Sequence, residues 1–341
     1  LLGGMGITIP RYLSVSISKH KISETQLVLR VSWAYLFMVC MITSAIYLLL
    51  YSRLTEYVIG DDNLVFYILC LLYAITIAIS SYFFAYYRGI GNFKMFNIVQ
   101  IIFQVLMVVP LLLPMKTLVT IIYEWTILNT IFIVSLSAIE YKKYKNIIKQ
   151  ITFRFSCFKK TFLELTGYSL PRLIGDFFLF AYSAFPVIYV GARLGYEETS
   201  YYSIGVSLVT MVTPVFSFLG VILLPHVAKK ISNNKVSEAN RLVIKLSIVY
   251  TVVAIFFTTI MYLGMECMIS VFFVYIYVAA LPIAKIIAIS LLPQAIYLLY
   301  RNPNDAASVF PYNTIILAIS FCVMVVGFMM SSSLMHFAYI Y

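Results

Sequence analysis

Long apolar runs dominate this sequence, and each run is about as long as a helix that crosses a bilayer. A hydrocarbon core of about 30 Å is spanned by roughly 20 apolar residues in a helix, whereas membrane β-strands show segments of about ten residues with alternating polarity. With 62% hydrophobic and 11% charged residues, the chain is predicted to be an all-helical, polytopic transmembrane bundle. A partial span is expected over 1–17, and nine full spans near 31–51, 64–87, 96–114, 117–139, 167–190, 201–225, 242–264, 279–300 and 313–330.

The positive charges lie in alternate loops rather than in one stripe. The net charge is +11, and a positive-inside bias places basic loops at the cytoplasmic side of a membrane. The residues assigned to the basic loops are Arg11, Lys19, Lys21, Arg88, Lys94, Lys142, Lys143, Lys145, Lys149, Arg154, Lys159, Lys160, Lys229, Lys230, Lys235, Arg241 and Arg301. The intervening loops are short and neutral or acidic. The charge therefore predicts topology and does not indicate a nucleic-acid partner.

One phrase of the sequence occurs twice, about 215 residues apart. SETQLVLRVS at 23–32 is matched by SEANRLVIKLS at 237–247, and further matches lie upstream and downstream in the same order. The pairs of residues that the repeat aligns are Arg30 with Lys245, Pro10 with Pro225, and Arg88 with Arg301. Matches that keep their order and their side of the membrane indicate an internal repeat.

The matched helices cross the membrane in the same direction, which predicts two parallel repeats related by an axis along the membrane normal. An N-terminal lobe is expected over 1–139 and a C-terminal lobe over 167–341, joined by a basic cytoplasmic linker over 140–166. Extension of the repeat predicts two pseudo-symmetric six-helix lobes and twelve helices in the intact protein. In this chain the first helix would be missing, the second partial and the last truncated.

Five segments carry a resemblance to a known family. The chain resembles the O-antigen and polysaccharide repeat-unit flippases of the multidrug/oligosaccharidyl-lipid/polysaccharide exporter superfamily. The likeness is one of overall pattern and runs over essentially the whole chain. The segments are GITIPRYLS at 6–14, YYRGIGNF at 86–93, YSLPRLIGDF at 168–177, GVILLPHVAK at 220–229 and RNPNDAASVFPYNT at 301–314.

This resemblance implies a multi-pass protein of the bacterial inner membrane that is not an enzyme and uses no cofactor. Its expected activity is to flip undecaprenyl-pyrophosphate-linked oligosaccharide units to the periplasmic leaflet by alternating access, coupled to a proton or sodium gradient. The expected partners are the lipid-linked oligosaccharide, membrane lipids and other polysaccharide-assembly proteins.

An anionic pyrophosphate substrate would need cations in the cleft, preferably arginine with its forked donors. The candidates are Arg30, Lys245, Arg172, Arg88 and Arg301. Each has a structural alternative. The side chains of Arg30 and Lys245 can extend from the membrane to the cytoplasmic lipid headgroups. Arg88 and Arg301 can be basic residues that only set the orientation of their helices in the membrane. Arg172 can form an ion pair with Asp176, four residues later on the same helical face.

Two acidic residues are candidates for ion coupling, Glu124 and Asp176. Glu124 is a lone acid deep in a predicted span, where a charged and unpaired carboxylate costs a few kcal/mol. It could bind the coupling proton or sodium ion, or be a protonated acid bonded to a neighbouring helix. Pro214, inside another span, is expected to kink its helix.

Two other functional classes remain open. A cation-coupled multidrug exporter of the same superfamily would prefer an acidic cleft for cationic substrates, and the charges within the spans lean basic. A membrane-embedded polymerase or glycosyltransferase would need a substantial loop with acid, base or metal ligands. The five cysteines are isolated and have no spacing typical of a metal site or disulfide. No metal site is expected.

Overall fold

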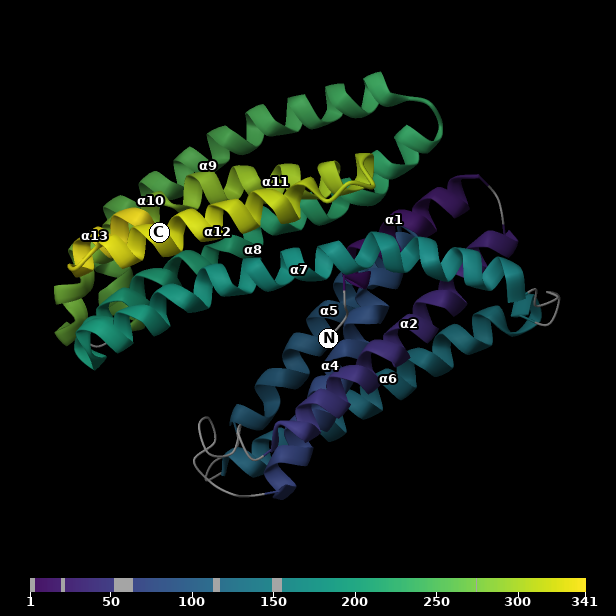
Figure 1. Cartoon of the computed structure of the whole chain (residues 1–341), viewed down its shortest axis with the longest axis horizontal. Coiled ribbons are helices and arrows are strands. Elements are labelled where there is room, and N and C mark those ends of the chain that lie inside the picture. Colours follow the sequence, from purple (N-terminus) through teal and green to yellow (C-terminus); the bar gives the residue numbers. More distant parts are fainter. Residues whose placement is uncertain (1–3, 20–21, 52–63, 113–116, 149–154, 274) are drawn as a thin grey trace. The chain divides into compact units, whose positions relative to one another are not determined.

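The computed structural model describes residues 4–19, 22–51, 64–112, 117–148, 155–273 and 275–341, and within these ranges all regular structure is helical. The elements are shown in Figure 1. They are α1 (Met5–Ser18), α2 (Ile22–Leu49), α4 (Leu64–Gly89), α5 (Phe93–Val108), η2 (Val109–Leu112), α6 (Leu118–Ile148), α7 (Phe155–Leu194), α8 (Tyr196–Ser232), α9 (Val236–Phe272), η3 (Tyr275–Ala280), α10 (Leu281–Ile289), α11 (Leu291–Ala307), α12 (Tyr312–Met330) and α13 (Leu334–Ile340).

The apolar runs predicted as membrane spans form helices wherever the structure describes them. Nine helical segments among the described residues are long and apolar enough to cross a membrane, which confirms the nine predicted spans. Many of their large apolar side chains face outward, such as Phe37 at 68% exposure and Phe180 at 69%. Such surfaces would be unfavourable in water but match a hydrocarbon environment, in which a helix also satisfies its own backbone hydrogen bonds.

The chain divides into two compact units, Leu1–Leu170 and Pro171–Tyr341, and the boundary falls within α7. The predicted linker over 140–166 is largely helical where it is described, because α6 continues to Ile148 and α7 begins at Phe155. Residues 149–154 lie outside the described residues. The predicted lobe limits and the twelve-helix count stay predictions.

In unit 1, α1 packs against α2 and α4, and α4 also packs against α5 and α6. Met5, Ile9 and Leu13 are fully buried and recur every four residues, so α1 has one continuous buried face. The turn between α4 and α5 contains Gly91 at φ 72°, a conformation that glycine adopts without steric cost. Asn92 then caps α5, since its side chain accepts a hydrogen bond from the Met95 amide at 3.1 Å.

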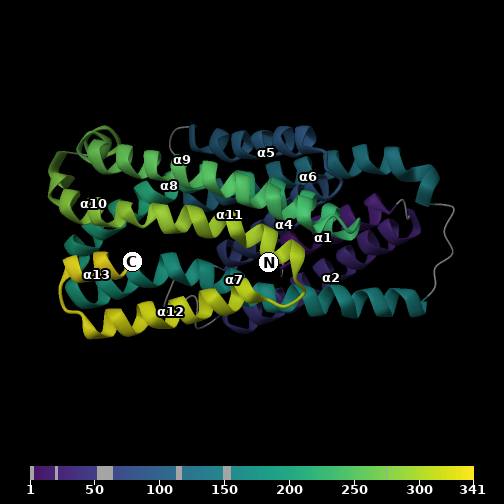
Figure 2. The same cartoon turned by 90° about the horizontal axis from the view of Figure 1, so that it is seen from above.

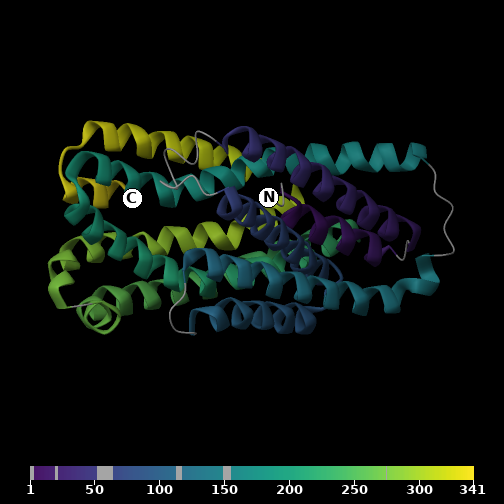
Figure 3. The same cartoon turned by 90° about the horizontal axis from the view of Figure 1, so that it is seen from below.

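In unit 2, α8 packs against α10 and α11, and α9 packs against the same two helices. Figure 2 and, from the opposite side, Figure 3 show α8, α9 and α11 running side by side. Two glycines of α8 permit this close packing. A methyl group on Gly205 would lie 3.1 Å from Ala284 Cα, and one on Gly220 would lie 2.6 Å from the Leu298 carbonyl oxygen.

The predicted span over 279–300 is two helices rather than one. α10 ends at Ile289 and α11 begins at Leu291, with Ser290 between them. Pro293 explains the interruption, because proline has no amide hydrogen to donate to the carbonyl four residues earlier, that of Ile289.

Candidate functional site

A buried ion pair joins α7 to α11 in unit 2. Arg172 Nε donates to Asp305 Oδ1 at 2.8 Å, and both side chains are 3% exposed. The same guanidinium donates to the carbonyls of Ser308 at 3.1 Å and Val309 at 3.4 Å. Arg172 therefore holds the segment between α11 and α12 against α7 and is not available as an unpaired cation.

A second ion pair lies one helical turn later along α7 and one helical turn earlier along α11. Arg301 Nη2 donates to Asp176 Oδ1, and the Asn313 side chain donates to the Arg301 carbonyl at 2.8 Å. The sequence spacing had favoured a pair between Arg172 and Asp176 within α7. These two ion pairs run between α7 and α11, so each aspartate neutralises an arginine of the other helix.

A cavity of about 330 Å³ lies in unit 2, beside this network. Tyr297 connects the two, because it lines the cavity and lies four residues before Arg301 on α11. The Tyr297 hydroxyl is buried and has no hydrogen-bond partner among the described residues. The other lining residues are aromatic, apolar or neutral polar: Leu179, Tyr182, Ser183, Ser290, Pro293, Gln294, Ile316, Leu317, Ser320 and Tyr341. Such a lining fits an aromatic or amphipathic molecule better than a multiply charged one.

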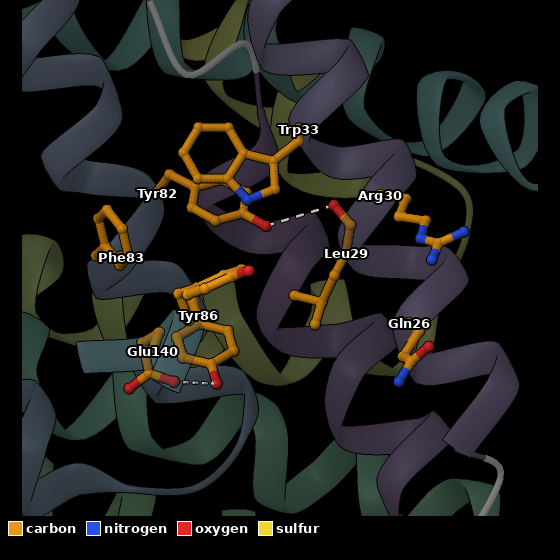
Figure 4. Close-up of a pocket in the computed structure, with 9 residues that line it drawn as sticks. Gln26, Leu29, Arg30, Trp33, Tyr82, Phe83, Tyr86 and Glu140 are labelled. Carbon is orange, nitrogen blue, oxygen red and sulfur yellow. Dashed lines mark hydrogen bonds between the residues drawn. The ribbon is translucent and has the colours of Figure 1, made fainter. Parts of the chain in front are cut away.

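A second pocket, of about 250 Å³, lies in unit 1 between α2, α4 and α6. Figure 4 shows Arg30 and Gln26 on one side of it, and Glu140 and the aromatic residues of α4 on the other. It is lined by Gln26, Leu29, Arg30, Trp33, Tyr82, Phe83, Tyr86, Glu140 and Tyr141. Arg30 is the only one of these that sequence reasoning selected.

Glu140 is fixed in this pocket by two tyrosines of α4. The Tyr86 hydroxyl donates to one carboxylate oxygen and the Tyr87 hydroxyl to the other, both at 2.9 Å. Hydrogen bonds donated to both oxygens fix the orientation of the carboxylate against α4. Sequence reasoning placed Glu140 in the linker and missed this role; its only sequence signal was an acid amid a basic segment.

The cations aligned by the repeat differ in their surroundings. Arg30 is half-buried at the unit 1 pocket, whereas Lys245 is exposed on α9. Arg88 donates to the Gly6 carbonyl at 2.9 Å, and its guanidinium lies 5.7 Å from the centre of the Phe96 ring. Arg88 thus links α4 to α1 and α5, which is a structural role. A shared cationic cleft built from these residues stays a prediction.

Glu124 is half-buried on α6, next to an aromatic pair. Trp125 stacks on Tyr73 with ring centres 5.4 Å apart and donates from Nε1 to the Met107 carbonyl at 2.8 Å. Trp125 therefore fixes this part of α6 against its neighbours. Neither ion-coupling candidate lies in a metal-like cluster, since the described residues contain no group of three or more histidine, cysteine or acidic side chains.

Comparison with known proteins identifies the fold. No protein-family model matches the sequence, and no curated protein matches it. Solved structures do match over nearly the whole chain. A MATE mutant has a TM-score of 0.80 at 10% identity, covering 99% of this chain and 80% of that chain. An outward-facing multidrug resistance MATE family transporter of the MOP superfamily has a TM-score of 0.78 at 11% identity, covering 99% and 79%.

A third match is a MOP superfamily transporter from Pyrococcus furiosus, described by the reverse polarity of its binding pocket, which suggests a different function for that protein. Its TM-score is 0.79 at 11% identity, covering 99% of this chain and 78% of that one. The chain therefore has the MATE-like helical fold. At 10–11% identity the likeness is one of fold, and it does not distinguish the O-antigen flippases from other proteins with this fold.

Proposed function

We propose that the protein is a secondary transporter that exports a small amphipathic organic molecule by alternating access, driven by a proton or sodium gradient. The observation that carries this proposal is the fold, which matches a multidrug resistance MATE family transporter at a TM-score of 0.78 over 99% of the chain. The nine apolar helical segments found among the described residues support a multi-pass membrane protein.

The charge distribution also supports this proposal over an anionic substrate. The basic residues within the spans had counted against a drug exporter. In unit 2, however, Arg172 is paired with Asp305 and Arg301 with Asp176. The two pairs together carry no net charge, so these arginines do not make the unit 2 cavity an anion site. Its neutral and aromatic lining suits the proposed substrate class.

Glu124 and Asp176 are the proposed ion-coupling residues. Both lie within helices long enough to span the membrane, where acidic side chains commonly take part in proton or ion transfer. Asp176 is 45% exposed although it is paired with Arg301. A proton arriving at Asp176 would therefore break a link between α7 and α11, which would couple protonation to helix movement.

A second candidate function is to flip an undecaprenyl-pyrophosphate-linked oligosaccharide in a bacterial inner membrane. Its support is the resemblance of five sequence segments to that family. One further observation favours it: the Arg30 guanidinium lines a pocket and has no hydrogen-bond or ion-pair partner among the described residues. Such a group could receive a phosphate oxygen.

Reconstitution into liposomes distinguishes the two functions. One set of vesicles would contain a fluorescent aromatic cation under an imposed proton or sodium gradient. A second set would contain an undecaprenyl-pyrophosphate-linked glycan, whose leaflet is reported by an external glycan-cleaving enzyme. Gradient-dependent movement of the cation supports the exporter. Movement of the glycan alone would replace the exporter with the flippase, and movement of neither would contradict both.

A further inference from the structure

The unit 1 pocket has a cation, Arg30, on one side and an anion, Glu140, on the other, with aromatic side chains of α4 beside Glu140. Gln26, Leu29, Arg30 and Trp33 are spaced three or four residues apart on α2, so they share one face of that helix. Glu140 lies on the other side, where the Tyr86 hydroxyl binds it (Figure 4). The Tyr87 hydroxyl binds its second carboxylate oxygen. A complementary ligand therefore carries an anionic group at the Arg30 side and an ammonium group at the Glu140 side.

The polar atoms of Gln26 also indicate a ligand. Its amide nitrogen and oxygen are both shielded from solvent and have no hydrogen-bond partner among the described residues. Leaving a buried polar group without a partner costs about 1–3 kcal/mol. A ligand oxygen at this side would accept from the Gln26 nitrogen and from Arg30 together.

The pocket lies at the basic end of unit 1. It is formed by the first turns of α2 and the last turns of α4 and α6. Arg88 follows on α4, and Lys142, Lys143 and Lys145 follow Glu140 in the sequence. Basic residues that flank membrane helices lie at the level of the lipid headgroups. A membrane-derived ligand would therefore present its phosphate at this depth.

An apolar track leads from the pocket along α2. Trp33 is 40% exposed, and Phe37 and Met41 follow at four-residue intervals with exposures of 68% and 57%. Because α2 enters the membrane from this end, the track runs from the headgroup level toward the hydrocarbon. An acyl chain would lie along these side chains. A free headgroup molecule would gain nothing from them.

We infer that this pocket binds an aminoalkyl phosphate, with the phosphate at Arg30 and Gln26 and the ammonium at Glu140 and the flanking rings, and that the source is an aminophospholipid. The tyrosine rings strengthen the cationic end because an aromatic face attracts an ammonium group. This inference is independent of the transported substrate.

The test uses tryptophan fluorescence, because the chain has two tryptophans, Trp33 and Trp125. In a Trp125→Phe protein, Trp33 is the sole reporter and it lines the pocket. The probes are dihexanoyl-phosphatidylethanolamine, dihexanoyl-phosphatidylglycerol of equal chain length but without an amine, and free phosphoethanolamine. The protein is the whole chain in detergent, and no transport activity is needed for the readout.

The expected result is a saturable change in Trp33 emission with the aminophospholipid. Arg30→Gln and Glu140→Gln should each weaken its apparent affinity by roughly tenfold or more, consistent with the loss of a charge-assisted hydrogen bond. Phe37→Ala should weaken binding of the lipid but not of free phosphoethanolamine. Arg241→Gln, at an exposed position on α9, is the control and should leave the apparent affinity for the lipid unchanged.

Three outcomes would overturn the inference. Phosphatidylglycerol that binds equally well, with no effect of Glu140→Gln, would remove the ammonium site. If free phosphoethanolamine binds as tightly as the lipid, the acyl chains contribute nothing and the ligand is not specifically an aminophospholipid. If both charge variants keep the parent's unfolding temperature and bind the lipid as the parent does, the lipid does not bind in this pocket.

Discussion

Arg172 and Asp305, 133 residues apart in the sequence, form an ion pair that is almost completely shielded from solvent. The attraction between the two charges offsets much of the cost of burying each of them. The pair also holds the carbonyls of Ser308 and Val309, so it fixes the end of α11 and the start of the following connection.

Removal of one partner of this pair should strongly destabilise unit 2. Asp305→Asn leaves the Arg172 charge buried and uncompensated, which typically costs about 3–5 kcal/mol. A large fall in the thermal unfolding temperature of the purified protein is the expected result. Replacement of both residues, as Arg172→Met with Asp305→Leu, should cost less than the two single changes added together. Additive losses would show that the two side chains do not act as a pair.

The more exposed pair should contribute much less to stability. Asp176 is 45% exposed and Arg301 is 15% exposed, and solvent-accessible pairs contribute about 0–1 kcal/mol. Asp176→Asn should therefore leave the unfolding temperature nearly unchanged, while transport driven by an ion gradient falls. A destabilisation as large as that of Asp305→Asn would contradict the assignment of Asp176 to coupling.

A methyl group at Gly220 should disrupt the contact between α8 and α11. The added carbon would lie 2.6 Å from the Leu298 carbonyl oxygen and 2.8 Å from the Asn302 side-chain nitrogen. Overpacking of this kind costs about 1–3 kcal/mol. Gly264→Ala is the matched control: apart from the backbone of its own helix and its chain neighbours, no described atom lies within 4 Å of the new methyl, and alanine is favoured over glycine in helices by about 1 kcal/mol. Unfolding temperatures of the two variants should move in opposite directions.

Glu124 should matter for coupling and not for folding. Glu124→Gln removes the titratable proton while keeping the size of the side chain. Transport against a substrate gradient should be lost while downhill exchange continues, because a side chain that no longer binds the ion cannot pass on the driving force of the ion gradient. Glu266→Gln, at an exposed position on α9, is the control. Equal loss in both transport modes would instead assign Glu124 to substrate binding or structure.

The membrane spans could be predicted because hydropathy is a local property of the sequence. The helix ends could not. α7 begins at Phe155, well before the predicted start at 167, because an apolar window marks the part of a helix that contacts lipid and says little about where backbone hydrogen bonding begins. The break at Ser290 was also missed, since the apolar run continues through it.

The candidate site was only partly predictable for a different reason. Sequence identifies charges but not their partners, and the spacing of Arg172 and Asp176 favoured a pair that tertiary packing replaced with two pairs to α11. Asp305 lay within a segment that carried the family resemblance, yet nothing local connected it to a residue 133 positions earlier. Glu140 and Gln26 became candidates only through the neighbours that the fold brings to them.

Pro214 of α8 and the interruption between α10 and α11 occur at the same level of unit 2. Thr213 precedes Pro214 on α8, and Gln294 follows Pro293 on α11. The Thr213 hydroxyl donates to the Gln294 side-chain oxygen at 3.4 Å. The tight glycine contacts lie on either side of this level, at Gly205 and Gly220. Because the interrupted backbone positions of the neighbouring helices lie at the same level, both helices are expected to bend there together. Flexing there would preserve the glycine-mediated contacts above and below, so unit 2 can bend without its helices separating.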